Sequence, residues 1–334
     1  MMKRISIGIF LFAVILMSCS RSNKNRFRFS VDDLPPEALT ILNYGKALFE
    51  ADTNNLQEEL YAMQHDFLPF LDADLSDSSN IRSIRNFITD TTLRRLYEVS
   101  TKVFPEPDGL SSSLTTAVRR YHYHFPEAMI PDYYLYISGV HHEVPVMAGE
   151  DAVVVATDCY LGQDFDYYQK LGIPMYRISR MTPEHIVNDI LTEMYVAYIE
   201  TTEKTNTVLD EMIRAGKRLF FLQAMQPELA ENILIGYHPE QLSWAENHEG
   251  ELWAFLIGED VLYSSDFLMI RKLFGDGPFT QDFSTEAPAR LGEWTGWQIV
   301  RKFADRHPDL SLAQIMNITD SQKILEGSKY KPKR

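Results

Sequence analysis

The segment RMTPEHIVNDILTEMYVAY, residues 180–198, predicts the helix at the centre of the fold. Thr182 suits the N-cap, Pro183 the first helical position and Glu184 the positive end of the helix dipole. Apolar residues then recur at spacings of three and four, as a buried helix requires. They form one row at Ile186, Ile190, Met194 and Ala197 and a second at Val187, Leu191 and Tyr198. Two apolar rows predict that most of this helix is buried.

The edge of this helix carries His185, Asp189 and Glu193, four residues apart and therefore on one face. Zinc peptidases place the two histidines of H-E-x-x-H at this spacing, with the catalytic Glu directly after the first His. Here Ile186 stands where that Glu belongs and Asp189 where the second His belongs. Isoleucine cannot activate a metal-bound water, so H-E-x-x-H chemistry is not available. We interpret His185 and Asp189 as a hydrogen-bonded or half-exposed pair, and predict no catalytic residue, no metal and no cofactor.

Two segments upstream of the helix have the composition of β-strands. Residues 131–139 (PDYYLYISG) and 151–162 (DAVVVATDCYLG) are rich in β-branched and aromatic residues and are bounded by Pro, Gly and Asp. Helical spacing covers residues 36 to about 126 and the chain after about 180. These patterns predict an α+β fold, mostly α, with a small central β-sheet packed among helices.

The chain has 334 residues, 45% of them apolar, which is enough for a sizeable core in one or two domains. No clear linker divides it. We therefore predict a single domain over residues 36–320, with a helical N-terminal part to about residue 126. Residues 19–35 are polar and basic and are predicted to form a tether, and residues 321–334 a basic tail.

The N-terminus has the parts of a secretory signal. Lys3 and Arg4 precede the apolar run ISIGIFLFAVILM, which is too short for a comfortable transmembrane span. The run ends in LMSC, which resembles the bacterial lipobox; an ordinary signal peptide with an incidental Cys is the alternative. We predict a signal peptide over residues 1–18 and an acylated Cys19 that anchors the protein to a membrane. Cys159 then has no disulfide partner and is expected to pack as a small apolar residue.

The net charge of −15 argues against nucleic acid as a partner, because phosphate binding needs a basic patch. Positive charge is concentrated at the two ends of the chain, after Cys19 and in the closing KYKPKR. Beside a membrane such runs can contact anionic head groups. Solvated tails fit the same composition equally well.

Four segments of the second half carry a family resemblance. They are TDCYLG (157–162), AGKRLFFL (215–222), GYHPEQLSWAENHEGELWAFL (236–256) and PARLGEWTGWQIVRKF (288–303), the last being the most specific. Together they resemble the GldB family of gliding-motility lipoproteins of Bacteroidetes, over a stretch that runs from the lipobox to about residue 305. That family is similar to zincin-type metallopeptidases without being an established enzyme, so the resemblance implies a zincin-like fold.

The resemblance also bears on the polar face of the central helix. In zincins of this kind a third ligand, a Glu, precedes a Gly on the next helix, and the matching segment RAGKRLFF has Ala215 there. Ile186, Asp189 and Ala215 thus replace three of the four functional positions, and only His185 remains. The resemblance implies that His185, Asp189 and Glu193 belong to a vestigial metal helix in a protein that is not an enzyme.

We expect a lipid-anchored envelope component linked to gliding motility or secretion, with other envelope or motility proteins as partners. A periplasmic metallohydrolase with a remodelled site is a second hypothesis, and a carrier of a peptide or lipid a third. Surface-exported lipoproteins of this phylum usually carry acidic residues after the Cys. The basic sequence CSRSNKNR therefore predicts retention on the periplasmic side.

Weaker candidates remain outside the central helix. Asp158, Trp294 and Trp297 could line the old substrate cleft, although the tryptophans also suit core anchors. Three groups of histidines and acids are more typical of surface turns and helices than of metal sites: His122 with His124, His141 to Glu143, and Glu246 with His248, Glu249 and Glu251. No G-x-S-x-G, G-x-G-x-x-G or P-loop motif occurs.

Overall fold

The computed structural model describes residues 27, 29–35, 37, 39–105, 108–201, 206–258, 260–277, 279–280 and 286–332. The predictions for the signal peptide, for Cys19 and for the basic residues up to Arg26 lie outside this part of the chain. None of the helices in the described ranges has the length and apolar character needed to cross a membrane.

A four-stranded mixed sheet lies among the helices, which confirms the α+β, mostly α fold class. Its strands are β1 (Ile41–Asn43), β2 (Asp132–Tyr136), β4 (Ala152–Ala156) and β3 (Val146–Ala148), in that spatial order. β1, β2 and β4 are parallel, and β3 pairs antiparallel with β4 at the edge. The two expected strands are β2 and β4. The strands β1 and β3 were not predicted, because three residues are too few to show alternation.

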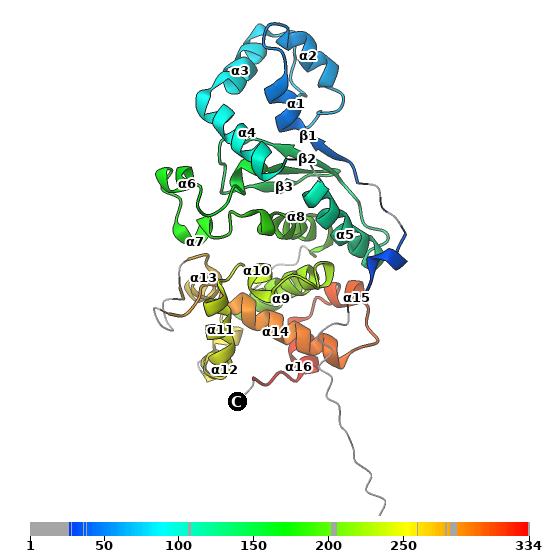
Figure 1. Cartoon of the computed structure of the whole chain (residues 1–334). Helices are drawn as coiled ribbons and strands as arrows, with labels where there is room; N and C mark the ends of the chain where they lie inside the picture. The colour runs from blue at the N-terminus through cyan, green and yellow to red at the C-terminus, as the bar shows by residue number, and fades with distance from the viewer. Residues whose placement is uncertain are drawn as a thin grey trace, which may run out of the picture.

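The two faces of the sheet pack against different helices. Tyr133 and its parallel partner Val153 are buried on the face toward the central helix, where the Tyr133 hydroxyl lies 3.3 Å from the sulfur of Met194. Tyr134 and Tyr136 point to the opposite face, where both rings contact Phe70. Figure 1 shows α1–α4 beyond this second face and α8 beneath the first. Both faces are therefore covered, as is usual for parallel strands.

Helices form the N-terminal cover of the sheet, as expected for residues up to 126. They are α1 (Tyr44–Glu50), α2 (Leu56–Met63), α3 (Ser78–Thr89), α4 (Thr91–Val103) and α5 (Asp108–His124). Asn43 ends β1 and caps α1 by accepting a hydrogen bond from the amide of Lys46 at 2.8 Å. Asn43 thus ends the strand and starts the helix. Because no loop separates β1 from α1, the sequence of β1 reads as part of the helical pattern.

The central helix begins and ends with irregular turns. It consists of the 3-10 turn η3 (Pro183–His185), α8 (Ile186–Met194) and the π-helical turn η4 (Tyr195–Ile199). Ile190 and Leu191 are 0% exposed, so the predicted burial of most of this helix is confirmed. Ala197, which was expected in the first apolar row, is exposed because it lies in the π-helical turn at the end. The short helices α6 (Asp166–Lys170) and α7 (Met175–Ile178) connect β4 to it.

The C-terminal half is built on the contact between α9 (Val208–Met225) and α14 (Leu291–Arg306). A β-carbon placed on Gly296 would lie 1.8 Å from the carbonyl oxygen of Met212, and one on Gly216 would lie 2.3 Å from the carbonyl carbon of Gly296. Only glycines allow this backbone approach. The surrounding helices are α10 (Glu231–Ile235), α11 (Pro239–Asn247), α12 (Glu249–Gly258), α13 (Phe267–Phe274), α15 (Leu312–Met316) and α16 (Ser321–Ser328).

The predicted domain, residues 36–320, is too short at both ends. Phe27 belongs to the predicted tether, yet it is buried with its ring against His124 of α5 and Phe220 of α9. At the other end, α16 begins at Ser321, within the predicted tail, and Tyr330 beyond it is buried against Trp253. The packed domain therefore extends from Phe27 to at least Tyr330, because large aromatic side chains at both ends have apolar partners.

Candidate functional site

The polar face of the central helix lies among arginines from three other segments. Arg180 follows α7, Arg218 lies on α9 and Arg290 directly precedes α14. The charge of Arg180 acts on both His185 and Asp189, and Arg290 also acts on Asp189. The predicted face of α8 therefore forms part of a charged region between the sheet-bearing half and the C-terminal helices.

His185 is the last residue of η3 and is 6% exposed. Its ring Nδ1 lies 2.8 Å from the hydroxyl of Thr182. Burial, followed by the nearby charges of Arg180 and His238, lowers the pKa of His185 from 6.5 to about 4. The imidazole is therefore neutral at pH 7. Thr182 is the N-cap residue, as predicted, but its hydroxyl meets this ring rather than a backbone amide.

Asp189 is partly buried and accepts a hydrogen bond of 2.7 Å from the hydroxyl of Tyr160. Tyr160 follows β4 within the TDCYLG segment and is buried. Burial raises the pKa of Asp189 from 3.8 to about 6, although the Tyr160 hydrogen bond and the charge of Arg180 oppose the increase. The carboxyl of Asp189 thus changes its charge near neutral pH.

Glu193 is also partly buried, and burial raises its pKa while the charge of Arg218 opposes the shift. The other two positions of the metallopeptidase pattern are apolar: Ile186 and Ala215 are both buried. In the part of the chain that the structure describes, no three or more His, Cys, Asp or Glu side chains come together as they would around a metal ion.

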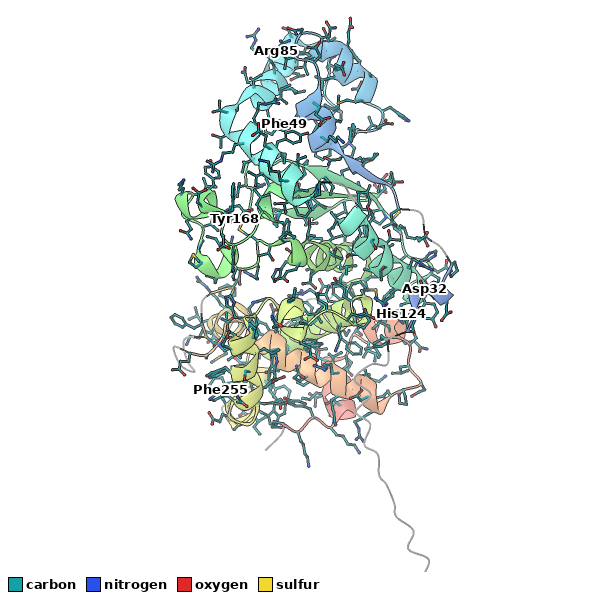
Figure 2. The ribbon with its side chains drawn as sticks, viewed as in Figure 1. Asp32, Phe49, Arg85, His124, Tyr168 and Phe255 are labelled. Atoms are coloured by element: carbon teal, nitrogen blue, oxygen red, sulfur yellow. The ribbon has the colours of Figure 1, made fainter. Side chains whose placement is uncertain are left out.

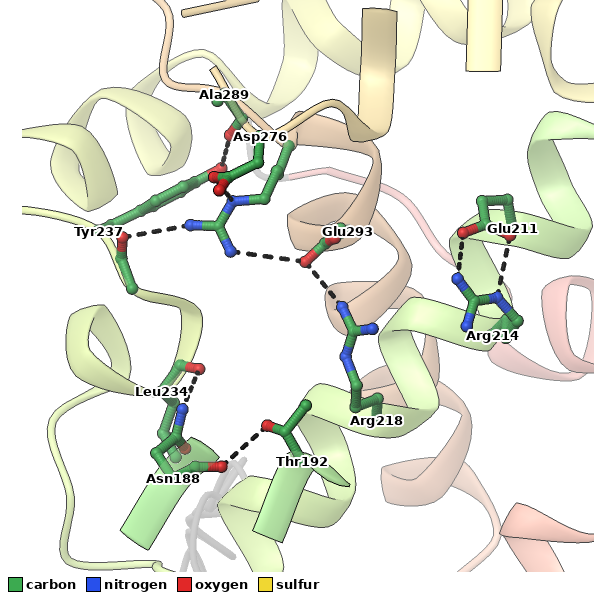
Figure 3. A network of polar contacts seen from close by, with 12 residues as sticks. Asn188, Thr192, Glu211, Arg214, Arg218, Leu234, Tyr237, Asp276, Ala289 and Glu293 are labelled. Atoms are coloured by element: carbon green, nitrogen blue, oxygen red, sulfur yellow. Dashed lines mark hydrogen bonds and ion pairs between the residues drawn. The ribbon is translucent and has the colours of Figure 1, made fainter. Parts of the chain in front are cut away.

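Two carboxylates link the arginines into a network. Asp276 contacts Arg180 at 2.7 Å and the Nε of Arg290 at 3.7 Å. Glu293 contacts Arg218 at 3.1 Å and Arg290 at 3.8 Å (Figure 3). Glu293 is buried at the first turn of α14, so its charge depends on these two arginines. This network was not predicted from the sequence, although Arg218, Arg290 and Glu293 all belong to the segments that carry the family resemblance.

The backbone around Arg290 is shaped to fit this network. Arg290 has a φ of 58°, in the left-handed region, and donates a hydrogen bond of 3.2 Å to the carbonyl of Gly236. Gly236 has a φ of 70°, and a β-carbon there would lie 2.7 Å from the Cδ of Arg180. The guanidinium of Arg290 also lies over the ring of Tyr237, at 5.5 Å. These contacts account for the Gly-Tyr pair at 236–237 and for the Arg of PARLGEW.

The three predicted cleft residues are core residues. Trp294 and Trp297 are 2% and 0% exposed, and the indole of Trp297 donates to Gln223 at 3.2 Å. Asp158 is 0% exposed and accepts hydrogen bonds from the amides of Ser138 and Val140 at 2.9 and 2.6 Å. The prediction that they line a cleft is therefore wrong: the aromatic rings fill the core, and the carboxylate holds the loop after β2.

The weaker histidine candidates lie in separate places. His122 pairs with Glu37 at 2.6 Å, and His124 packs edge-on against Phe27. His142 lies 3.4 Å from Arg177, and His248 stacks on Trp244. The free Cys159 is buried, as expected, and burial raises the pKa of its thiol.

The family model described as gliding motility protein GldB matches residues 24–332, and its name marks the family as lipoproteins of the envelope. The resemblance to GldB is thereby confirmed and extends beyond residue 305. No curated protein and no solved structure matches the chain significantly. Since the match spans nearly the whole sequence, the chain belongs to the GldB family and is a protein related to gliding motility.

Proposed function

We propose that this protein is a lipid-anchored, catalytically inactive component of the gliding motility or secretion machinery, with a zincin-like fold and a position on the periplasmic side. Its partners are the membrane, through the acylated Cys19, and other envelope or motility proteins. The face of α8 is the observation that carries this proposal, because it keeps the spacing of a metal helix without its chemistry.

Ligand counting supports the loss of catalysis. Catalytic zinc sites keep three protein ligands and an open position for water. Ile186 and Ala215 are buried apolar residues that can neither bind a metal nor move a proton. His185 and Asp189 supply two ligands at most, and each already has a hydrogen-bond partner. Among the described residues Glu193 does not join them in a group of three that could hold a metal ion. The face therefore serves packing and charge pairing in this proposal.

The position of Phe27 indicates that a lipid anchor at Cys19 would hold the folded domain close to the membrane. Its ring lies between α5 and α9, eight residues after Cys19. Eight extended residues reach at most about 28 Å. Acyl chains on Cys19 would therefore keep the junction of α5 and α9 near the bilayer, where the domain can meet other envelope proteins.

One observation favours a metallohydrolase as a second candidate. His185, Asp189 and Glu193 all have shifted pKa values on one helix face, and shifted groups cluster at functional sites. Burial is the largest cause of all three shifts, so the packing of the helix explains them without a reaction, and this candidate ranks second.

Gliding complementation tests the proposal. A variant with His185→Ala, Asp189→Asn and Glu193→Gln would be expressed in a gliding strain that lacks its own copy of the gene. We expect spreading on agar to match that of the exposed control Glu184→Gln, provided that both proteins accumulate equally. Loss of spreading at equal protein levels would contradict an inactive site.

A further inference from the structure

A cavity of 390 Å³ opens on the side of the sheet away from α8, between α1, α3 and the end of β2. Its apolar wall consists of Tyr44, Leu48, Phe49, Phe70, Ile84 and Phe87. Figure 2 labels Phe49 in this upper part of the molecule. The volume lies within the range of small-ligand sites, which are mostly apolar with a few polar groups.

The wall of the cavity is built from stacked aromatic rings. Tyr44 stacks on Phe70 at 4.3 Å, and Phe49 stacks on Tyr97 at 5.0 Å. Tyr136 on β2 contacts the same Phe70 at 5.3 Å. Protein interiors contain few voids larger than a water molecule. A space of this size between fixed rings is therefore a shaped pocket rather than loose packing.

The polar groups of the pocket come from serine, tyrosine and histidine side chains. Ser83, Ser138 and His141 line it together with Tyr44 and Tyr136, and no Arg, Lys, Asp or Glu side chain of the described ranges does. Within the described residues, neither the Tyr44 nor the Tyr136 hydroxyl has a hydrogen-bond partner. Burial raises the pKa of Tyr136 to about 12, so its hydroxyl keeps its proton and can donate.

The charge near the pocket disfavours an anion. Asp158 acts on Tyr136 from behind the wall, where it accepts a hydrogen bond of 3.0 Å from the hydroxyl of Ser138. Burial raises the pKa of Asp158, and the hydrogen bonds from Ser138 and Val140 oppose the increase. No Arg or Lys side chain of the described residues lines the pocket, and the guanidinium of Arg94 lies 5.9 Å from the centre of the Phe49 ring. Because the lining is mostly apolar and holds no Arg or Lys, we expect an uncharged ligand with an apolar body and an oxygen that accepts from a tyrosine hydroxyl.

We propose that this pocket binds the alkyl chain of an uncharged single-chain amphiphile, with its hydroxyl, ester or amide oxygen at Tyr44 and Tyr136. At roughly 30 Å³ per carbon, the volume of one water in the liquid, a chain of about ten carbons fills most of the space. The site is separate from the polar face of α8, which lies across the sheet (Figure 1).

The test uses 1-decanol as the probe and the full chain carrying Cys19→Ser, which takes no acyl chain. Calorimetric titration should show saturable one-to-one binding of decanol and at least tenfold weaker binding of decanoate at pH 8. Absence of saturable decanol binding would overturn the proposal, and equal affinity for decanoate would overturn the uncharged ligand class.

Two variants locate the binding. Ser83 is exposed on α3 and lines the pocket, so Ser83→Trp should block it and lower decanol affinity at least tenfold. Asn86→Trp places the same side chain on an exposed position of α3 outside the pocket and should leave the affinity unchanged. Unaltered affinity in Ser83→Trp would place the decanol elsewhere and refute the site.

A third variant guards against misfolding of Ser83→Trp. Tyr44→Phe with Tyr136→Phe keeps both rings and removes both hydroxyls. It should weaken decanol binding about tenfold, in line with the loss of one well-made hydrogen bond, and should leave the far-UV circular dichroism spectrum unchanged. Full affinity in this folded variant would contradict the role of the hydroxyls.

Discussion

Replacing Asp189 with asparagine is expected to stabilise the protein at neutral pH and above. The asparagine would keep the shape of the side chain and an oxygen that accepts from the Tyr160 hydroxyl, which lies 2.7 Å from the carboxylate. What the substitution removes is the charge, and burial is the main reason that the pKa of Asp189 rises from 3.8 to about 6. The charged carboxylate therefore lowers the stability of the wild-type protein.

The size and pH dependence of this effect follow from the two pKa values. Because the folded-state pKa is the higher one, the protonated carboxyl favours folding below about pH 4, and this contribution is lost as the pH rises through 6. The full difference is about 3 kcal/mol, at 1.36 kcal/mol for each tenfold change in the proton equilibrium. We expect Asp189→Asn to gain about 2–3 kcal/mol at pH 8 and almost nothing at pH 4.

Urea unfolding at a series of pH values, followed by circular dichroism, measures this difference. Tyr160→Phe is the matched control: it removes the hydroxyl but leaves the carboxylate buried, so it should lower stability at pH 8 by about 1–3 kcal/mol. An Asp189→Asn variant that is less stable than wild type at pH 8, or whose gain does not change with pH, would refute the reasoning.

Three further predictions concern the core and the anchor. Gly296→Ala should lower the free energy of unfolding by about 3 kcal/mol or more, because the new β-carbon would lie 1.8 Å from the Met212 carbonyl oxygen. In the same urea assay the control Gly258→Ala, whose β-carbon would meet nothing within 4 Å, should change this free energy by less than about 1 kcal/mol. Ile190→Asp should cost several kcal/mol, since Ile190 is fully buried, and a melting temperature close to wild type would show that the inward face is wrong. Cys19→Ala should release the protein from membranes or leave it unprocessed; normal processing with wild-type membrane fractionation would contradict lipidation.

The parts of the fold that repeat over many residues could be predicted from the sequence. The central helix has two apolar rows over the 13 residues from Ile186 to Tyr198, and β2 and β4 have five strand residues each, so their patterns exceed chance. β1 and β3 have only three residues each and exist because they pair with β2 and β4. Pairing with a distant strand leaves no pattern in the local sequence. The packing of Phe27 and Tyr330 likewise depends on partners more than 70 residues away in sequence.

The candidate site could be predicted only along a single helix. The spacing of His185, Asp189 and Glu193 sets one face by helix geometry alone. The hydrogen bond from Tyr160 joins the segment after β4 to α8, and the ion pairs of Glu293 join α14 to Arg218 of α9 and to Arg290. Contacts between distant segments leave no periodic signal in the sequence. Trp294 and Trp297 show a different limit of sequence-based prediction. Large aromatic side chains occur both in binding clefts and in cores, and here both are buried in the core.

The metal content of the purified protein tests the proposed loss of catalysis most directly. The chain would be purified without added metal or chelator, and its zinc measured by inductively coupled plasma mass spectrometry beside His185→Ala. We predict zinc well below one equivalent in both proteins, because Ile186 and Ala215 remove the base and the third ligand. One equivalent of zinc in the wild-type protein that disappears in a folded His185→Ala variant would contradict this account and favour the metallohydrolase.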